Sequence, residues 1–142
     1  DLIHDLKISD QVHFAYEKFS QGLRGDHHDG LYTLSDAYAH ARACTYFSTY
    51  EGFGNAFVEA VLSKTPIFVN NYKPVYWPDI GSKGFRTVML ENNQLTDQKV
   101  QQMREVIYND RLNREIAEHN YQLGRKYFSY DVLKQKLQEL IG

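Results

Sequence analysis

Residues 49–60, with the sequence TYEGFGNAFVEA, constrain the fold of this chain more than any other stretch. They follow a short run rich in strand-forming residues, 43–48, and lead into a helical pattern that begins near Asn55. Gly52 and Gly54 let the backbone turn sharply between the two and approach a ligand closely. Because the first N–H groups of a helix lack partners within it, the sequence predicts an anion-binding corner here.

Two carboxylates flank this corner from opposite ends. Glu51 precedes the glycine turn, and Glu59 lies about one turn inside the helix. The plain alternatives are a turn acid near a helix N-terminus for Glu51 and a solvated helix carboxylate paired with Lys64 or another base for Glu59. The spacing of the pair across the glycine turn favours a shared pocket.

Composition limits the class of protein. With 142 residues, of which 42% are hydrophobic, the chain can form one domain with its own core. Sixteen basic and eighteen acidic residues, without a long basic run, make nucleic acid a poor partner. Cys44, the single cysteine, fits a small buried thiol in a reducing, cytoplasmic setting. No apolar run approaches the roughly 20 residues that a membrane-spanning helix needs, so we predict no membrane span in this segment.

Strand and helix patterns alternate along the chain. The stretches that we predict as strands are residues 11–15, 43–48, 67–69 and 86–90. The stretches that we predict as helical are residues 1–8, a segment starting at Thr33, residues 55–63, and everything from Thr96 onward with breaks at 109–110 and 128–129. This order predicts an α/β, Rossmann-like fold: a mostly parallel sheet of about four to five strands flanked by helices, with a helical C-terminal section. Ligands of such sheets bind beyond the carboxyl ends of the strands, which is where the corner lies.

Two connecting stretches leave alternatives open. Residues 16–30 are polar and glycine-bearing, which predicts a long exposed loop. Within it, we interpret the cluster His27-His28-Asp29 as part of the loop and not as a metal site, because adjacent side chains point in different directions and no further His or Cys follows at ligand spacing. Residues 72–84 predict an irregular connection, in which Tyr76 and Trp77 either pack or line a cleft.

Several nucleotide and nucleophile motifs are missing. Gly52-Phe53-Gly54 begins like a dinucleotide fingerprint, but Phe57 stands where the third glycine belongs. No Gly-Lys-Ser or Gly-Lys-Thr phosphate loop and no G-x-S-x-G nucleophile motif is present. What remains is a corner suited to a diphosphate, with carboxylates that accept hydrogen bonds from vicinal hydroxyls. Sugars and ribose offer such hydroxyls.

The motif E-x(7)-E, formed by Glu51 and Glu59 around the glycine turn, resembles the donor site of a known enzyme family. The chain from about Val12 to its C-terminus is similar to the C-terminal, nucleotide-sugar-binding domain of retaining group 1 glycosyltransferases (glycosyltransferase family 4), which have GT-B architecture. The other matching segments are Asp36-Ala37-Tyr38, Thr65-Pro66-Ile67 and Tyr127-Phe128-Ser129-Tyr130.

The resemblance implies a role for each residue of the corner. Glu51 would be catalytic and face the donor sugar, while Glu59 would bind the nucleotide ribose. The donor would also lie against the glycine turn and the start of the helix, with Leu34 and Tyr32 near the base; the segment concerned is Gly52, Phe53, Gly54, Asn55, Ala56 and Phe57. The co-substrate would be a nucleotide diphosphate sugar, UDP- or GDP-hexose, and no metal or other cofactor is expected.

Features of the family that this sequence lacks also matter. Family members open this domain with a strand, a glycine loop and an Arg and a Lys that clamp the diphosphate, and they bind the acceptor through a separate N-terminal domain. We therefore expect residues 1–142 to be a single, partial donor-binding domain that is inactive alone. The segment 22–30 is longer than the family leads us to expect, and it is either an insertion that sets specificity or a surface loop. The alternatives left open are a non-catalytic sugar-nucleotide-binding or assembly module and a phosphorylase or epimerase of the same architecture.

Overall fold

The computed structural model of the chain describes residues 1–14, 32–72 and 74–141. The chain divides into two compact units, Asp1–Ala37 and Tyr38–Gly142. The division falls within helix α2 (Leu34–His40). The cluster His27-His28-Asp29 and the predicted loop 16–30 lie outside the described residues.

Local capping sets the helices of the first unit. Helix α1 (Leu2–Asp5) begins at Asp1, whose carboxylate accepts a hydrogen bond from the Ile3 N–H at 3.0 Å. Helix α2 begins with a reciprocal cap: the Asp36 N–H donates to the Thr33 hydroxyl at 3.2 Å, and the Thr33 N–H donates to the Asp36 carboxylate at 2.8 Å. The predicted helix start at Thr33 is confirmed.

The predicted strand at residues 11–15 is wrong over the part that the structure describes. Val12, His13 and Phe14 form neither strand nor helix, and Ala15 lies outside the described residues. Phe14 is 70% exposed. An alternating pattern forms a strand only where a neighbouring strand completes its hydrogen bonds, and none pairs with these residues.

A parallel sheet forms the centre of the second unit. Its strands are β1 (Cys44–Tyr46), β2 (Ile67–Asn70) and β3 (Val88–Leu90), in the order β1-β2-β3. Both pairings are parallel, with Cys44 opposite Ile67 and Phe68 opposite Val88. The α/β class and the parallel sheet are confirmed, although the described residues contain three strands and not four or five.

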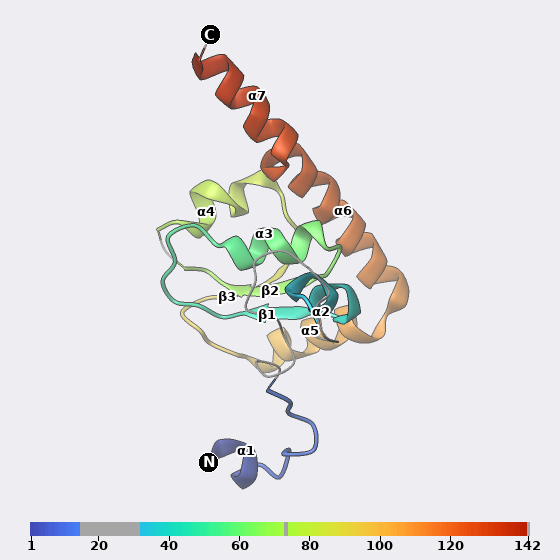
Figure 1. Cartoon of the computed structure of the whole chain (residues 1–142). Coiled ribbons are helices and arrows are strands. Elements are labelled where there is room, and N and C mark those ends of the chain that lie inside the picture. Colours follow the sequence, from blue (N-terminus) through green and yellow to red (C-terminus); the bar gives the residue numbers. More distant parts are fainter. Residues whose placement is uncertain (15–31, 73, 142) are drawn as a thin grey trace. The chain divides into compact units, whose positions relative to one another are not determined.

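Strand β2 is buried on both faces, as its unbroken apolar run predicts. Ile67 and Val69 point into a cluster with Phe57 and other residues of helix α3 (Asn55–Leu62). Phe68 points the opposite way, into a cluster with Val106 and Ile116. Figure 1 shows α3 on one side of the sheet and helix α5 (Asp97–Tyr108) on the other.

Polar caps separate the C-terminal helices. Thr96 caps α5 by accepting a hydrogen bond from the Lys99 N–H, and Asn109 caps helix α6 (Asp110–Phe128) by accepting one from the Leu112 N–H. Helix α7 (Tyr130–Ile141) follows Ser129 and extends beyond the sheet layers (Figure 1). Both predicted breaks are confirmed.

The connection at residues 72–84 contains more regular structure than its prolines and glycines predict. It forms a short helix α4 (Tyr76–Asp79) and a 3-10 turn η2 (Gly81–Lys83). Tyr76 is buried and packs edge-to-face on Phe57. Trp77 is 59% exposed, so of this aromatic pair only Tyr76 belongs to the core.

Candidate functional site

The corner after β1 depends on a glycine at position 54. Gly54 precedes α3 with a φ of 116°, a conformation that side-chain-bearing residues rarely adopt. A Cβ on Gly54 would lie 2.2 Å from the hydroxyl oxygen of Tyr72, which itself donates a hydrogen bond to the Phe53 carbonyl at 3.1 Å. Backbone conformation and close packing thus both require a glycine here.

Gly52 differs from Gly54. Its φ does not lie in the left-handed region, and a Cβ added to it would meet no atom within 4 Å. The sharp turn predicted for the pair therefore rests on Gly54. Gly52 leaves open space beside the loop.

The start of α3 presents unpaired backbone donors. The Gly54 carbonyl accepts from the N–H groups of Phe57 at 3.0 Å and Val58 at 3.3 Å. The N–H groups of Asn55 and Ala56 precede these bonds, so the helix itself offers them no acceptor. The Phe57 side chain is fully buried in the core, and its N–H is already used. The anion-binding site predicted for the corner stays a prediction, and the backbone N–H groups that this helix start offers to it are those of Asn55 and Ala56.

Glu51 is partly exposed, between the end of β1 and the glycine turn. Hydrogen bonding to the hydroxyls of Ser48 and then Tyr46 lowers the pKa of its carboxyl below the ordinary value. Burial and the Glu51 carboxylate raise the pKa of Tyr46 to about 12. Glu51 is thus held as a carboxylate with protonated hydroxyls beside it.

Glu59 is exposed on α3 and has a phenol beside it. The Tyr38 hydroxyl donates to the Glu59 Oε2 at 3.4 Å, and the Tyr38 carbonyl accepts from the Thr65 hydroxyl at 2.8 Å. Burial, followed by the charge of Glu59, raises the pKa of Tyr38 to about 12. Lys64 pairs with Glu118 at 2.8 Å, so the alternative of a Glu59–Lys64 pair does not hold.

Glu51 and Glu59 lie on the two sides of the glycine turn, and both raise the pKa of Tyr46. Glu51 does so by a hydrogen bond and by its charge, and Glu59 by its charge alone. A groove of about 530 Å³ runs along α3 from Phe53 and Asn55 to Glu59. Its other wall comes from the junction of α6 and α7 and includes Tyr127 and Phe128.

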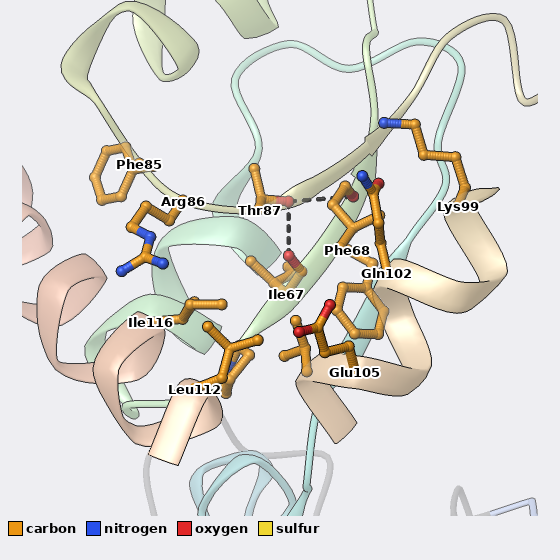
Figure 2. Close-up of a pocket in the computed structure, with 13 residues that line it drawn as sticks. Ile67, Phe68, Phe85, Arg86, Thr87, Lys99, Gln102, Glu105, Leu112 and Ile116 are labelled. Atoms are coloured by element: carbon orange, nitrogen blue, oxygen red, sulfur yellow. Dashed lines mark hydrogen bonds between the residues drawn. The ribbon is translucent and has the colours of Figure 1, made fainter. Parts of the chain in front are cut away.

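A second cavity, of about 450 Å³, lies at the amino edge of the sheet, where the parallel strands begin, opposite the carboxyl edge that carries the corner (Figure 2). Residues at the starts of β2 and β3 line it together with α5 and α6. Figure 2 shows the Thr87 hydroxyl turned toward the Ile67 carbonyl, to which it donates at 2.7 Å, and shows Lys99 and Glu105 extending from α5. No residue of the predicted site contributes to this cavity.

Leu34 and Tyr32 belong to the first unit, and both are exposed. Their predicted place near the nucleotide base stays a prediction. Within the described ranges, no group of three or more His, Cys, Asp or Glu side chains is arranged to hold a metal ion. In the same ranges, no helix has both the length and the apolar character needed to cross a membrane.

Comparison with curated proteins finds relatives named mannosylglucosylglycerate synthase. One from Petrotoga mobilis is 48% identical over 60 residues, which are 42% of this chain and 14% of the relative. One from Thermotoga maritima is 30% identical over 105 residues, which are 66% of this chain and 24% of the relative. The chain is related to glycosyltransferases. It spans less than a quarter of the length of each of these relatives. No family model and no solved structure matches the chain.

The sequence pattern did not indicate a role at the corner for Asn70. Asn70 ends β2 and is 2% exposed, and its side chain bonds to the loop that leads to Glu51. The available signal was a polar residue directly after the buried run 67–69 at the carboxyl end of a predicted strand.

Proposed function

We propose that the full-length protein is a retaining glycosyltransferase of GT-B architecture and that this chain contributes its donor-binding domain. It would transfer a hexose from a UDP- or GDP-hexose to an acceptor hydroxyl. The observation that carries the proposal is the pair of carboxylates, Glu51 and Glu59, on the two sides of one glycine corner at the start of α3, with Glu59 accepting a hydrogen bond from the Tyr38 hydroxyl. The similarity to the two synthases supports it.

Each part of the corner has a chemical task in this proposal. The N–H groups of Asn55 and Ala56, at the positive end of α3, would stabilise the diphosphate as it leaves with growing negative charge. Glu59 would accept hydrogen bonds from the ribose hydroxyls. Glu51 would hold the donor sugar and stabilise the positive charge that develops on it when the glycosidic bond breaks.

The names of the relatives suggest the first substrates to try. Mannosylglucosylglycerate contains a mannosyl group joined to glucosylglycerate, so GDP-mannose with glucosylglycerate is the first donor and acceptor pair, and UDP-glucose is the second donor. We expect the acceptor to bind through another part of the full-length protein. The isolated chain is expected to be inactive, and the single cysteine Cys44 fits a cytoplasmic enzyme.

Substitution of the two glutamates in the full-length protein tests the proposal. We expect Glu51→Ala to lower kcat at least about 100-fold, because the lost charge acts in the transition state. Glu59→Ala should raise the donor KM about 10- to 100-fold, since hydrogen bonds to a charged group contribute about 1.5–3 kcal/mol. Release of nucleoside diphosphate, with and without acceptor, measures both.

Glu118→Ala is the matched control. Glu118 is an exposed helix carboxylate on α6, away from the corner, whose loss removes one surface ion pair with Lys64. The kcat and the donor KM of Glu118→Ala should stay within about twofold of those of the parent enzyme. If Glu51→Ala and Glu59→Ala behave like Glu118→Ala, the proposed donor site is wrong.

A further inference from the structure

Three asparagines are buried in the second unit, and each side chain is hydrogen-bonded. They are Asn70, Asn113 and Asn120, with exposed fractions of 2%, 8% and 1%. A buried amide needs partners for its N–H and its carbonyl oxygen, so such a residue fixes the segments that supply them. What an asparagine holds therefore depends on where its partners lie.

Asn70 links two loops at the carboxyl edge of the sheet. It stands at the end of the central strand, where its Nδ2 donates to the Ser48 carbonyl at 3.0 Å. Its Oδ1 accepts from the Asn93 N–H at 2.8 Å. Ser48 lies in the loop after β1 and Asn93 in the loop after β3, so one amide holds the loops that follow both outer strands.

The segment 48–53, which carries Glu51, depends on few such contacts. In the described part of the chain, two side chains from outside the segment donate hydrogen bonds to its backbone: Asn70 to the Ser48 carbonyl and Tyr72 to the Phe53 carbonyl. Glu51 lies between these two anchor points. Among the residues that the structure describes, no strand forms a hydrogen bond with the backbone of Glu51, Tyr50 or Gly52.

The Ser48 side chain extends this contact along the loop toward Glu51. Its hydroxyl donates to the carbonyl of Tyr50, the residue before Glu51, at 3.1 Å, and it lowers the pKa of the Glu51 carboxyl. Because Asn70 fixes the Ser48 backbone, it also fixes the place from which this hydroxyl meets Glu51. We propose that Asn70 is a positioning residue that holds Glu51 in its orientation for sugar transfer through the Ser48 backbone. This inference rests on the proposed function, because it assigns Asn70 a role only if Glu51 acts on the donor.

Asn120 offers a matched control at the opposite edge of the sheet. Its Oδ1 accepts from the Arg86 N–H at 2.8 Å, and its Nδ2 donates to the Arg86 carbonyl at 2.7 Å. The two asparagines are therefore equally buried and make the same kinds of bonds, but the bonds of Asn120 hold the start of β3, away from Glu51. If the same substitution destabilises the protein equally at both asparagines, a difference in kcat between the two variants reports the positioning of Glu51 and not the loss of stability.

The test compares Asn70→Asp with Asn120→Asp in the full-length protein, with GDP-mannose or UDP-glucose as donor. In each variant one carboxylate oxygen keeps the bond from a backbone N–H, and the other faces a carbonyl oxygen that it repels. We expect both variants to lower the thermal unfolding midpoint. Asn70→Asp should also lower kcat about 10- to 100-fold with donor affinity nearly unchanged, because displacement of a reacting group by about 1 Å costs up to 100-fold. Asn120→Asp should keep kcat within about twofold.

Ser48→Ala tests the next step of the contact and does not alter the core. Ser48 is partly exposed, so this variant is expected to fold even if Asn70→Asp does not. It should lower kcat several-fold while leaving the unfolding midpoint close to that of the parent protein. A kcat that is unchanged in Ser48→Ala, or that falls equally in Asn70→Asp and Asn120→Asp, overturns the positioning role.

Glu51→Ala in the same assay separates this inference from the proposed function. If Glu51→Ala loses transfer and Asn70→Asp retains it, the positioning role fails alone. If Glu51→Ala retains transfer, both the proposed function and the role of Asn70 fail.

Discussion

The carboxyl and amino edges of the parallel sheet have different chemistry. At the carboxyl edge, the loop after β1 leads through Glu51 to the start of α3, where the N–H groups of Asn55 and Ala56 have no acceptor within the helix. At the amino edge, a cavity of about 450 Å³ is lined by residues of the second core cluster, such as Phe68 and Val106, and by the charged side chains of Arg86, Lys99 and Glu105. Volume alone does not distinguish the two edges.

What separates the edges is the direction of their polar groups. In parallel sheets, the loops that leave the carboxyl ends of the strands converge, and helix N-termini point toward that side. The polar side chains at the amino edge instead complete the fold: Asn120 holds the Arg86 backbone, and Thr87 donates to Ile67. The comparison teaches that the volume of a cavity is weaker evidence for a site than polar groups that converge where a strand ends and a helix begins.

The largest effect on the carboxyl edge is expected from Gly54→Ala. The new Cβ would lie 2.2 Å from the Tyr72 hydroxyl and would require a left-handed backbone at an alanine. We expect a loss of about 2–4 kcal/mol in the free energy of unfolding, from strain and overpacking together. Denaturant unfolding of the full-length protein measures it.

Gly52→Ala is the control for this change. Because a Cβ at Gly52 meets no atom within 4 Å, its unfolding free energy should stay within about 0.5 kcal/mol of the parent value. If the donor lies against this open side of the loop, the donor KM should rise about tenfold, which corresponds to about 1.4 kcal/mol. Equal destabilisation by the two alanines would contradict the distinction between the glycines.

The sequence predicted the corner because its signals are local. A strand run, a glycine turn and a helical pattern stand next to one another, and the caps at Thr33, Thr96 and Asn109 are equally short-range. The reason for Gly54 is different, since Tyr72 reaches it from a distant part of the chain. Nearby residues carry no information about that contact.

Long-range partners also explain what the sequence did not predict. Asn70 and Asn120 bond to backbone groups 22 to 34 residues away, so nothing beside them in the sequence marks their roles. The wrong prediction of a strand at residues 11–15 also comes from a missing long-range partner. The alternation of Val12 and Phe14 is a local pattern, but a strand forms only when a neighbouring strand pairs with it. Roles that depend on partners far along the chain require the structure.

A smaller effect at the carboxyl edge concerns pH. Tyr46→Phe removes one of the two hydroxyls that lower the pKa of Glu51 and keeps the ring that packs edge-to-face on Tyr72. The pKa of Glu51 should rise toward its ordinary value, because its carboxylate loses a hydrogen bond. The acid limb of the pH profile of kcat/KM should therefore move to higher pH.

The sign of the same shift applies to stability. A carboxyl whose pKa is lowered by folding stabilises the folded state above its ordinary pKa, and this contribution is lost as the pH falls through the folded-state value. Tyr46→Phe should therefore lower stability at pH values above the ordinary pKa of Glu51, and its difference from the parent protein should vanish as the pH falls below the folded-state value. Tyr108→Phe, which alters an exposed phenol at the end of α5, is the control. An acid limb that coincides in the two variants would show that Tyr46 does not act on Glu51.

The smallest effect on activity is expected at the amino edge, where Lys99→Gln combined with Glu105→Gln removes two charges from the lining of the cavity. Neither side chain has an ion-pair partner in the described part of the chain, so the unfolding free energy should change by no more than about 0.5 kcal/mol. The kcat and the donor KM should both stay within about twofold, because the carboxyl edge is untouched. Donor titration and initial rates of the full-length variant measure these quantities. A tenfold rise in donor KM would place donor binding at the amino edge and contradict the assignment of the donor site to the carboxyl edge. Only a donor bound close to Lys99 and Glu105 would respond to the loss of their charges.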